Sequence, residues 1–191
     1  MALPDEATQG NGGSGHFEEV LLDRITEASA WAEQDIDPDT QAETRRLITE
    51  TLNGDAEAAT ELSDAFGGRL AFGTAGLRGR LGAGPRRMNR TVVSQTSAGF
   101  AAYLLERAAA GRTAAPPSIV VGYDGRVGSA VFARDTAEVM AGAGVRVFLL
   151  PEAGPTPLTA FAVRHLGVSA GVMVTASHNP PRDNGYKVYL G

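Results

Sequence analysis

Between residues 89 and 174, short apolar runs alternate with segments of helical period, and this alternation restricts the chain to few folds. The apolar runs lie at residues 118–121, 145–150 and 168–174, and the helical segments at residues 89–110, 129–141 and 156–167. Strands that alternate with helices form a largely parallel sheet with helices on both faces. The sequence therefore predicts an α/β protein with three layers, α/β/α.

A fourth apolar run, at residues 186–190, follows a spacer that contains Pro180 and Pro181. Only 11 residues separate Val174 from Tyr186. A helical crossover between parallel strands needs about a dozen residues or more. We therefore predict an antiparallel edge strand here, which gives a mixed, mostly parallel four-stranded sheet.

The first 68 residues differ from the rest of the chain. Residues 1–16 are rich in glycine, which predicts a disordered tail. Segments of helical character at residues 17–33, 39–52 and 55–66 predict a helical N-terminal extension over residues 17–68. The α/β/α domain then occupies residues 69–191.

Charge is divided unevenly along the chain, although the net charge is only −5. Residues 1–64 contain 16 acidic residues and 3 arginines, whereas residues 65–105 contain no carboxylate. That second segment holds six arginines, namely Arg69, Arg78, Arg80, Arg86, Arg87 and Arg90. It suits an anionic ligand. A basic segment that packs against the acidic N-terminal part explains it equally well, and both interpretations stay open.

Composition disfavours several classes of partner. Aromatic residues make up 6% of the chain and do not alternate with the arginines, so we expect no nucleic-acid binding. No apolar run approaches the roughly 18 residues of a membrane span, and no signal peptide is recognisable, so we expect no membrane association. The chain has no cysteine, which is compatible with a reducing compartment. We therefore expect a cytoplasmic protein.

The apolar run at 168–174 leads directly into Thr175-Ala176-Ser177-His178-Asn179-Pro180. Open α/β sheets bind their ligands at this end of the strands. Ser177 has no Gly-x-Ser-x-Gly elbow, and His178 as its direct neighbour points away from it, so a hydrolase is disfavoured. Lys187 is the single lysine beside sixteen arginines, and an amine can lose a proton where a guanidinium cannot. Ser177 and Lys187 together indicate group transfer, with a structural Ser-His pair as the alternative.

Two further loops are candidates for the same ligand site as the Ser177 loop. The glycine-rich segment 72–82 is neither a Walker loop nor a dinucleotide fingerprint. Its glycines let backbone amides approach an anion, and an arginine among them can bind phosphate, unless the segment is a flexible connector. The segment 122–126 ends in Asp124-Gly125-Arg126 and follows the first core strand. It is either an ordinary turn or a third part of the site.

These segments resemble the α-D-phosphohexomutases, which include phosphoglucomutases, phosphomannomutases and some phosphopentomutases. Residues 175–180 resemble the phosphoserine motif of that family, and residues 183–187 resemble its continuation. Residues 72–79 are similar to the first loop of the phosphoglucomutase-2-like and phosphopentomutase-like branch, and the helical segment around Trp31 resembles the N-terminal extension of that branch. The resemblance covers residues 17–191 and assigns residues 69–191 to domain I of a mutase.

The resemblance implies a role for each half of the Ser177–Lys187 pair. Ser177 is the expected phosphoserine, which donates its phosphoryl group to a sugar phosphate and is phosphorylated again from the bisphosphate. Lys187 is the expected general base for the accepting hydroxyl, a role that requires a lowered pKa.

The resemblance also implies a binding set. Arg78 and Thr74 are expected to bind phosphate, His178 to support the transfer, and Arg126 to join the substrate-binding residues. The phosphoserine is expected to supply one oxygen ligand to Mg²⁺. Glucose 1,6-bisphosphate or a similar sugar bisphosphate is the expected activator.

The other motifs of such an enzyme do not occur in this sequence. The family draws an Asp-Gly-Asp-Gly-Asp metal loop, a sugar-selecting loop and a further phosphate-binding loop from domains II, III and IV. We therefore expect the chain to be a first domain, present as a fragment, a truncated product or a separate subunit. Efficient activity is expected only with domains II to IV in cis or in trans. The alternative is a noncatalytic module that binds sugar phosphates or another protein.

Overall fold

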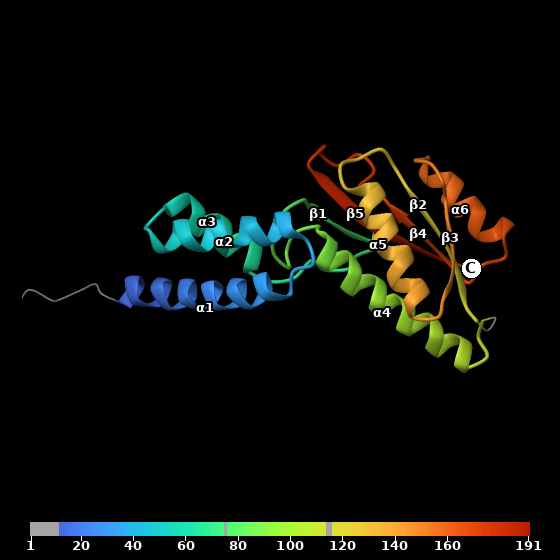
Figure 1. Cartoon of the computed structure of the whole chain (residues 1–191), viewed down its shortest axis with the longest axis horizontal. Coiled ribbons are helices and arrows are strands. Elements are labelled where there is room, and N and C mark those ends of the chain that lie inside the picture. Colours follow the sequence, from blue (N-terminus) through green and yellow to red (C-terminus); the bar gives the residue numbers. More distant parts are fainter. Residues whose placement is uncertain (1–11, 75, 114–115) are drawn as a thin grey trace, which may run out of the picture.

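The computed structural model describes residues 12–74, 76–113 and 116–191, which form a helical unit beside an α/β/α domain (Figure 1). The helical unit contains α1 (Gly12–Gln34), α2 (Pro38–Leu52) and α3 (Ala56–Phe66). The domain contains β1 (Leu77–Arg80), α4 (Arg90–Ala109), β2 (Ser118–Tyr123), α5 (Ser129–Gly142), β3 (Arg146–Leu149), α6 (Thr156–His165), β4 (Ala170–Val174) and β5 (Asp183–Leu190).

Local capping explains where two helices of the N-terminal unit begin. Asp37 and Asp55 precede α2 and α3, and their side chains accept hydrogen bonds from backbone amides of the first turn. The first helix starts earlier than predicted, because α1 includes residues 12–16 of the expected tail. Extending an existing helix adds one hydrogen bond per residue, which offsets a poor composition. Residues 1–11 of that predicted tail lie outside the described residues.

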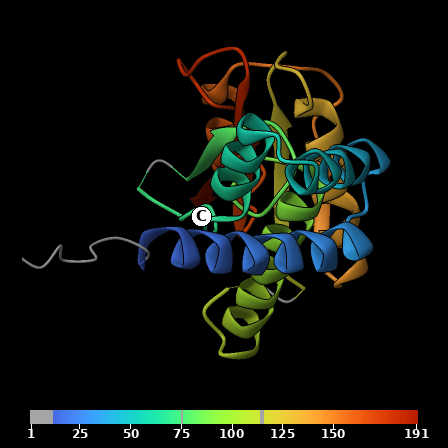
Figure 2. The same cartoon turned by 90° about the vertical axis from the view of Figure 1, so that its left-hand side faces the viewer.

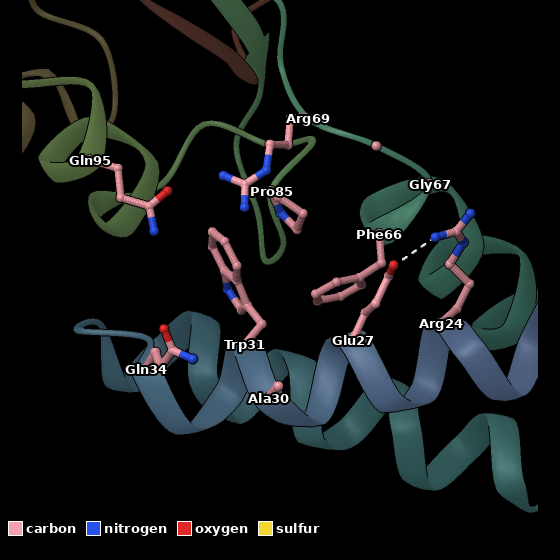
Figure 3. Close-up of a pocket in the computed structure, with 11 residues that line it drawn as sticks. Arg24, Glu27, Ala30, Trp31, Gln34, Phe66, Gly67, Arg69, Pro85 and Gln95 are labelled. Atoms are coloured by element: carbon pink, nitrogen blue, oxygen red, sulfur yellow. Dashed lines mark hydrogen bonds and ion pairs between the residues drawn. The ribbon is translucent and has the colours of Figure 1, made fainter. Parts of the chain in front are cut away.

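The helical unit contacts the domain near β1 and the start of α4 (Figure 2). Trp31 packs against the apolar clusters of both parts and meets Phe66 edge to face, with ring centroids 6.4 Å apart. Figure 3 shows Trp31 at a cavity of about 420 Å³, with Phe66 on one side and the loop around Pro85 above. Packing around one aromatic side chain therefore joins the two parts.

Most arginines of the acid-free segment pair with protein carboxylates. Both Arg86 and Arg87 contact Asp64, at 3.0 and 2.7 Å. Arg80 lies 3.5 Å from Glu61, and Arg90 holds Asp135 through two bonds of 2.8 Å. For Arg80, Arg86 and Arg87 the second interpretation is therefore correct, since they pack against the acidic N-terminal part. Arg78 has no such partner among the described residues.

The sheet has the strand order β1-β5-β4-β2-β3. Strands β2, β3 and β4 pair in parallel, whereas β5 runs antiparallel to both β4 and β1. The mixed α/β/α architecture is confirmed, and so is the antiparallel direction of β5. Two details were wrong, because the described sheet has five strands and β5 lies inside it rather than at its edge.

The unpredicted strand is β1, which lies in the glycine-rich segment. Its sequence Leu-Arg-Gly-Arg has no strand-like run of apolar residues. It is a strand because its backbone pairs with β5, from Leu77 opposite Tyr186 to Arg80 opposite Asp183. Strand propensity depends strongly on such neighbours, so the short segment alone did not reveal it.

Helices cover both faces of the sheet. Residues of α4 and α5, such as Val93 and Phe132, share a core with Val172 and Tyr186. On the opposite face, α6 packs its Val163 against Val120. No helix within the described residues is both long enough and apolar enough to cross a membrane.

Candidate active site

The site is centred on the loop that follows β4, where Ser177 meets Lys187. Nζ of Lys187 donates a hydrogen bond of 2.7 Å to Oγ of Ser177. Ser177 is exposed and has a φ of 56°, and no other described residue except glycine has a positive φ. This left-handed conformation is uncommon for serine, and such outliers cluster at functional sites. The predicted pair is therefore in direct contact.

The alternation of β5 explains why Lys187 reaches this position. Successive side chains of a strand point to opposite faces. Tyr186 is fully buried on the α4 and α5 side, and its hydroxyl lies 3.1 Å from Oγ of Ser97. Burial raises the pKa of Tyr186 to about 12. Lys187 consequently lies on the other face, at the open end of the site.

The surroundings of Lys187 make its amine easier to deprotonate than that of a free lysine. Partial burial lowers the pKa of the amine, and the neighbouring Arg78 guanidinium lowers it further, while Asp124 opposes the shift. A general base must give up its own proton before it can accept another one. The electrostatics therefore agree with the base role expected for Lys187.

Beside this pair lies a cavity of about 270 Å³ between β5 and the glycine-rich loop. It is lined by Phe72, Gly73, Thr74, Gly76, Arg78, Lys187, Val188 and Tyr189. Gly76 has a φ of 86°, and a Cβ at this position would overlap the carbonyl oxygen of Tyr186. Glycine is required here because the loop backbone packs directly on β5. The predicted residues Thr74, Arg78 and Lys187 thus line one cavity.

Arg78 keeps hydrogen-bonding capacity for a ligand. Its Nη1 contacts Oδ1 of Asn179 at 3.5 Å, and its buried Nε has no partner among the described residues. A buried donor without a partner costs free energy. Within the described part of the chain, the terminal nitrogens of Arg78 are held only by the long contact to Asn179, so they can donate charge-assisted bonds to an anion in the cavity. Arg78 therefore fits the predicted phosphate-binding role.

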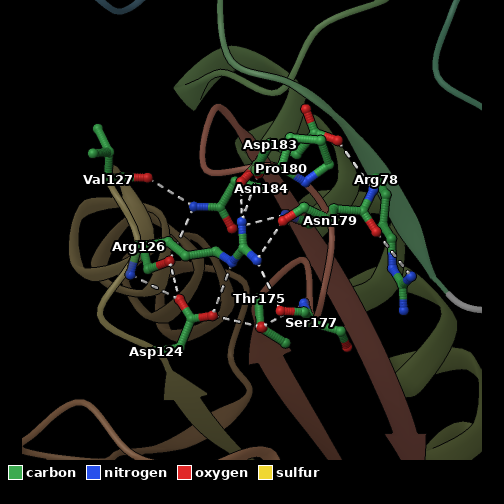
Figure 4. A network of polar contacts seen from close by, with 12 residues as sticks. Arg78, Asp124, Arg126, Val127, Thr175, Ser177, Asn179, Pro180, Asp183 and Asn184 are labelled. Atoms are coloured by element: carbon green, nitrogen blue, oxygen red, sulfur yellow. Dashed lines mark hydrogen bonds and ion pairs between the residues drawn. The ribbon is translucent and has the colours of Figure 1, made fainter.

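His178 and Arg126 do not line this cavity. The imidazole of His178 is exposed and has no hydrogen bond within the described part of the chain. The guanidinium of Arg126 donates to the backbone carbonyl oxygens of Ser177, Asn179, Pro180 and Asp183 (Figure 4). Its contacts are with the serine loop itself.

Asp124 and Thr175 lie beside Ser177, although the sequence analysis named them only as members of their loops and assigned neither a role of its own. Oδ2 of Asp124 accepts a hydrogen bond of 2.6 Å from Thr175, whose Oγ1 accepts the amide of Ser177 at 3.0 Å. One signal was available, since Asp124 directly follows a core strand and is one of only six acidic residues after residue 64. An acidic side chain at that edge of the sheet indicates a site.

The described residues contain no group of three or more His, Cys, Asp or Glu side chains that could hold a metal ion. They therefore provide no complete donor set for Mg²⁺, and one phosphoserine oxygen would not make one.

Comparison with known proteins identifies the domain. Residues 69–191 match the model of phosphoglucomutase/phosphomannomutase, alpha/beta/alpha domain I. The chain belongs to the phosphoglucomutase/phosphomannomutase family. Its membership confirms the resemblance inferred from the serine loop and the glycine-rich segment.

Relatives of this mutase-family domain carry several names. The probable phosphomannomutase of Haemophilus influenzae is 61% identical over 104 residues, which are 54% of this chain and 20% of that protein. The human phosphopentomutase is 40% identical over 195 aligned residues, covering 99% of this chain and 29% of its own length. A solved structure from Thermus thermophilus, described as a phosphomannomutase, has a TM-score of 0.57 and 37% identity. The matched region is 64% of this chain and 26% of the chain in that structure. The chain thus spans less than a third of each.

Proposed function

We propose that this chain is the phosphoserine-bearing first domain of a phosphosugar mutase, an intramolecular phosphotransferase that acts through a sugar bisphosphate. The observation that carries the proposal is the contact between Lys187 and Ser177, 2.7 Å long, beside a cavity lined by Arg78. This arrangement combines a nucleophile, Ser177, with a base of lowered pKa, Lys187, and with an arginine donor that has no partner among the described residues, Arg78.

In the transfer step, a hydroxyl of the sugar phosphate attacks the phosphorus of phosphorylated Ser177. The new bond joins phosphorus to the sugar oxygen, and the bond between phosphorus and Oγ of Ser177 breaks. Lys187 accepts the proton of the attacking hydroxyl and passes it to Oγ of Ser177, which leaves as an alkoxide 2.7 Å from Nζ. Return of the other phosphate from the bisphosphate to Ser177 restores the resting form and completes the isomerisation.

Arg78 and Thr74 bind a phosphate group in the cavity, and the exposed His178 supports the transfer. Phosphorylated Ser177 would supply one oxygen ligand to Mg²⁺, and the ion would neutralise charge on the transferred group. The rest of the magnesium site belongs to other domains, because the described residues lack it. Glucose 1,6-bisphosphate, or a similar sugar bisphosphate, acts as the activator.

We further propose that domains II to IV complete the active site, in cis or in trans, in the cytoplasm. The chain spans 20% and 29% of two relatives, which leaves room for three more domains in such an enzyme. The names of those relatives refer to mannose and pentose phosphates. The proposal therefore covers hexose and pentose phosphates alike.

Phosphorylation of Ser177 tests the proposal directly. The chain is incubated with glucose 1,6-bisphosphate and Mg²⁺, alone and with domains II to IV of a relative, and analysed by intact mass and phosphopeptide mapping. We expect one phosphoryl group on Ser177, lost in Ser177→Ala and retained in the exposed control Ser29→Ala. If no phosphoserine forms even with the added domains, the transferase proposal fails and a noncatalytic sugar-phosphate-binding module replaces it.

A further inference from the structure

The backbone of Ser177 is held on both sides by groups that lead to one carboxylate. Its amide donates to Oγ1 of Thr175, and its carbonyl oxygen accepts from Nη2 of Arg126 at 2.8 Å. Thr175 donates to Oδ2 of Asp124, and Nε of Arg126 lies 3.4 Å from the same oxygen (Figure 4). Asp124 is therefore linked to both peptide groups of Ser177, to one through Thr175 and to the other through Arg126.

Both terminal nitrogens of Arg126 donate to the protein, which leaves its Nη groups no free donor for a ligand. A guanidinium carries five N–H groups. Nη1 donates to the carbonyl oxygens of Pro180 at 2.9 Å and Asp183 at 3.1 Å. Nη2 donates to those of Ser177 and Asn179, and Nε faces Asp124. Arg78 is the opposite case, with a buried Nε that has no partner among the described residues.

Asp124 is itself fixed to the scaffold of the domain. Its second oxygen, Oδ1, accepts from Oγ of Ser129 at 2.7 Å and from the amide of Arg126 at 3.1 Å. Ser129 is buried at the start of α5 and also receives a hydrogen bond from Asn184 of β5. The carboxylate thus connects β2, α5 and β5. Its bonds to Thr175 and Arg126 attach the serine loop to these regular elements.

We propose that Asp124 and Arg126 form a positioning clamp that holds Ser177 in its left-handed conformation and keeps Oγ at Nζ of Lys187. The clamp orients the phosphoryl carrier and does not bind the phosphate of the substrate. This inference rests on the proposed function. A serine at a φ of 56° is disfavoured unless its surroundings enforce the conformation. Without the clamp the loop relaxes, and Oγ leaves the position that Lys187 and the cavity require.

Three variants separate positioning from phosphate binding. Arg126→Met removes all five donors, Arg126→Lys keeps the charge, and Arg134→Met is the matched control at an exposed arginine of α5. We expect the maximal rate of Ser177 phosphorylation from glucose 1,6-bisphosphate to fall about 100-fold in both Arg126 variants, with the half-saturating concentration within about twofold. Lysine does not rescue, because one ammonium cannot reach four carbonyl oxygens as a planar fork does.

Amide hydrogen exchange provides a readout that needs no phosphoryl transfer. In Arg126→Met, we expect the amides of Ser177, Asn179 and Asp183 to exchange at least about tenfold faster, while β2 and β4 keep their protection. A raised half-saturating concentration with unchanged exchange would make Arg126 a phosphate ligand and overturn the clamp. Unchanged rate and exchange would overturn it as well. Failure of the wild-type chain to become phosphorylated contradicts the proposed function alone, and exchange still decides the clamp.

The wild-type chain offers a test for the case that the Arg126 variants do not fold. Four bonds to backbone carbonyls must hinder rotation of the Arg126 guanidinium, so we expect separate, slowly exchanging Hη signals in the NMR spectrum. Arg134 is exposed and serves as the internal reference for free rotation. An Arg126 that rotates as freely as Arg134 would overturn the proposal.

Discussion

At the scale of single residues, the same side-chain type takes opposite roles in this domain. Arg78 keeps a buried donor without a partner among the described residues, whereas Arg126 donates four hydrogen bonds to backbone carbonyl oxygens and pairs with Asp124. Lys187 differs from both, because its amine can become neutral.

Replacing this amine by a guanidinium tests its role as a base. We expect Lys187→Arg to fold and to retain phosphate binding but to lose at least about 100-fold of the transfer rate in the completed enzyme, since guanidinium does not deprotonate. The measurement is turnover with domains II to IV present, with circular dichroism as the control for folding. Turnover near that of the wild type would refute the base role.

The single lysine also permits a direct pH titration. The pKa of Lys187 is lowered by burial and by Arg78, so the amine becomes neutral below its ordinary value of 10.5. The transfer rate then increases with pH up to that pKa. Stability also increases with pH between the folded value and 10.5, because the unfolded chain binds the extra proton in that range. The NMR signal of the one Nζ, followed against pH, gives the value, and a midpoint at or above 10.5 contradicts the prediction.

At the scale of elements, the pairing of β1 with β5 places Arg78 at the site. Arg78 lies opposite Gly185 in the ladder, and Gly185 directly precedes Tyr186 and Lys187 in the sequence. A Cβ on Gly185 would lie 2.7 Å from the carbonyl oxygens of both Leu77 and Thr175. The absence of this side chain lets β1, β5 and the start of the serine loop approach one another.

Adding one methyl group tests this close approach. We expect Gly185→Ala to lower the free energy of unfolding by about 1–3 kcal/mol, because the backbone around it must shift. The control is Gly99→Ala on α4, where a Cβ meets nothing within 4 Å, and alanine there is expected to be neutral or slightly stabilising. Urea unfolding monitored by circular dichroism measures both, and equal stabilities for the two variants would count against the packing requirement.

At the scale of the whole molecule, packing outweighs charge in joining the helical unit to the domain. Asp64, which pairs with Arg86 and Arg87, has a side chain that is 53% exposed, and exposed ion pairs contribute about 0–1 kcal/mol. Trp31 instead contacts the apolar clusters of both parts. The two parts are therefore expected to unfold together.

The only tryptophan of the chain reports on this junction. We expect its fluorescence and the far-ultraviolet circular dichroism to follow one coincident urea transition. Trp31→Ala should lower stability by about 3 kcal/mol and separate the unfolding of the helical unit from that of the domain, whereas Asp64→Asn should cost less than about 1 kcal/mol. Two separate transitions in the wild type, or a larger loss in Asp64→Asn, would contradict this ranking.

The sequence by itself determined the α/β/α class, the antiparallel β5 and the Ser177 and Lys187 pair, because these depend on local period, spacer length and rare side-chain chemistry. It did not reveal β1, whose four residues become a strand only through the backbone of β5. Nor did it separate Arg126 from Arg78, since the carbonyl oxygens that occupy Arg126 lie 51 to 57 residues further along the chain. Only the tertiary structure decided these points, because hydrogen bonds to backbone atoms far away in the chain cannot be recognised from the order of residue types.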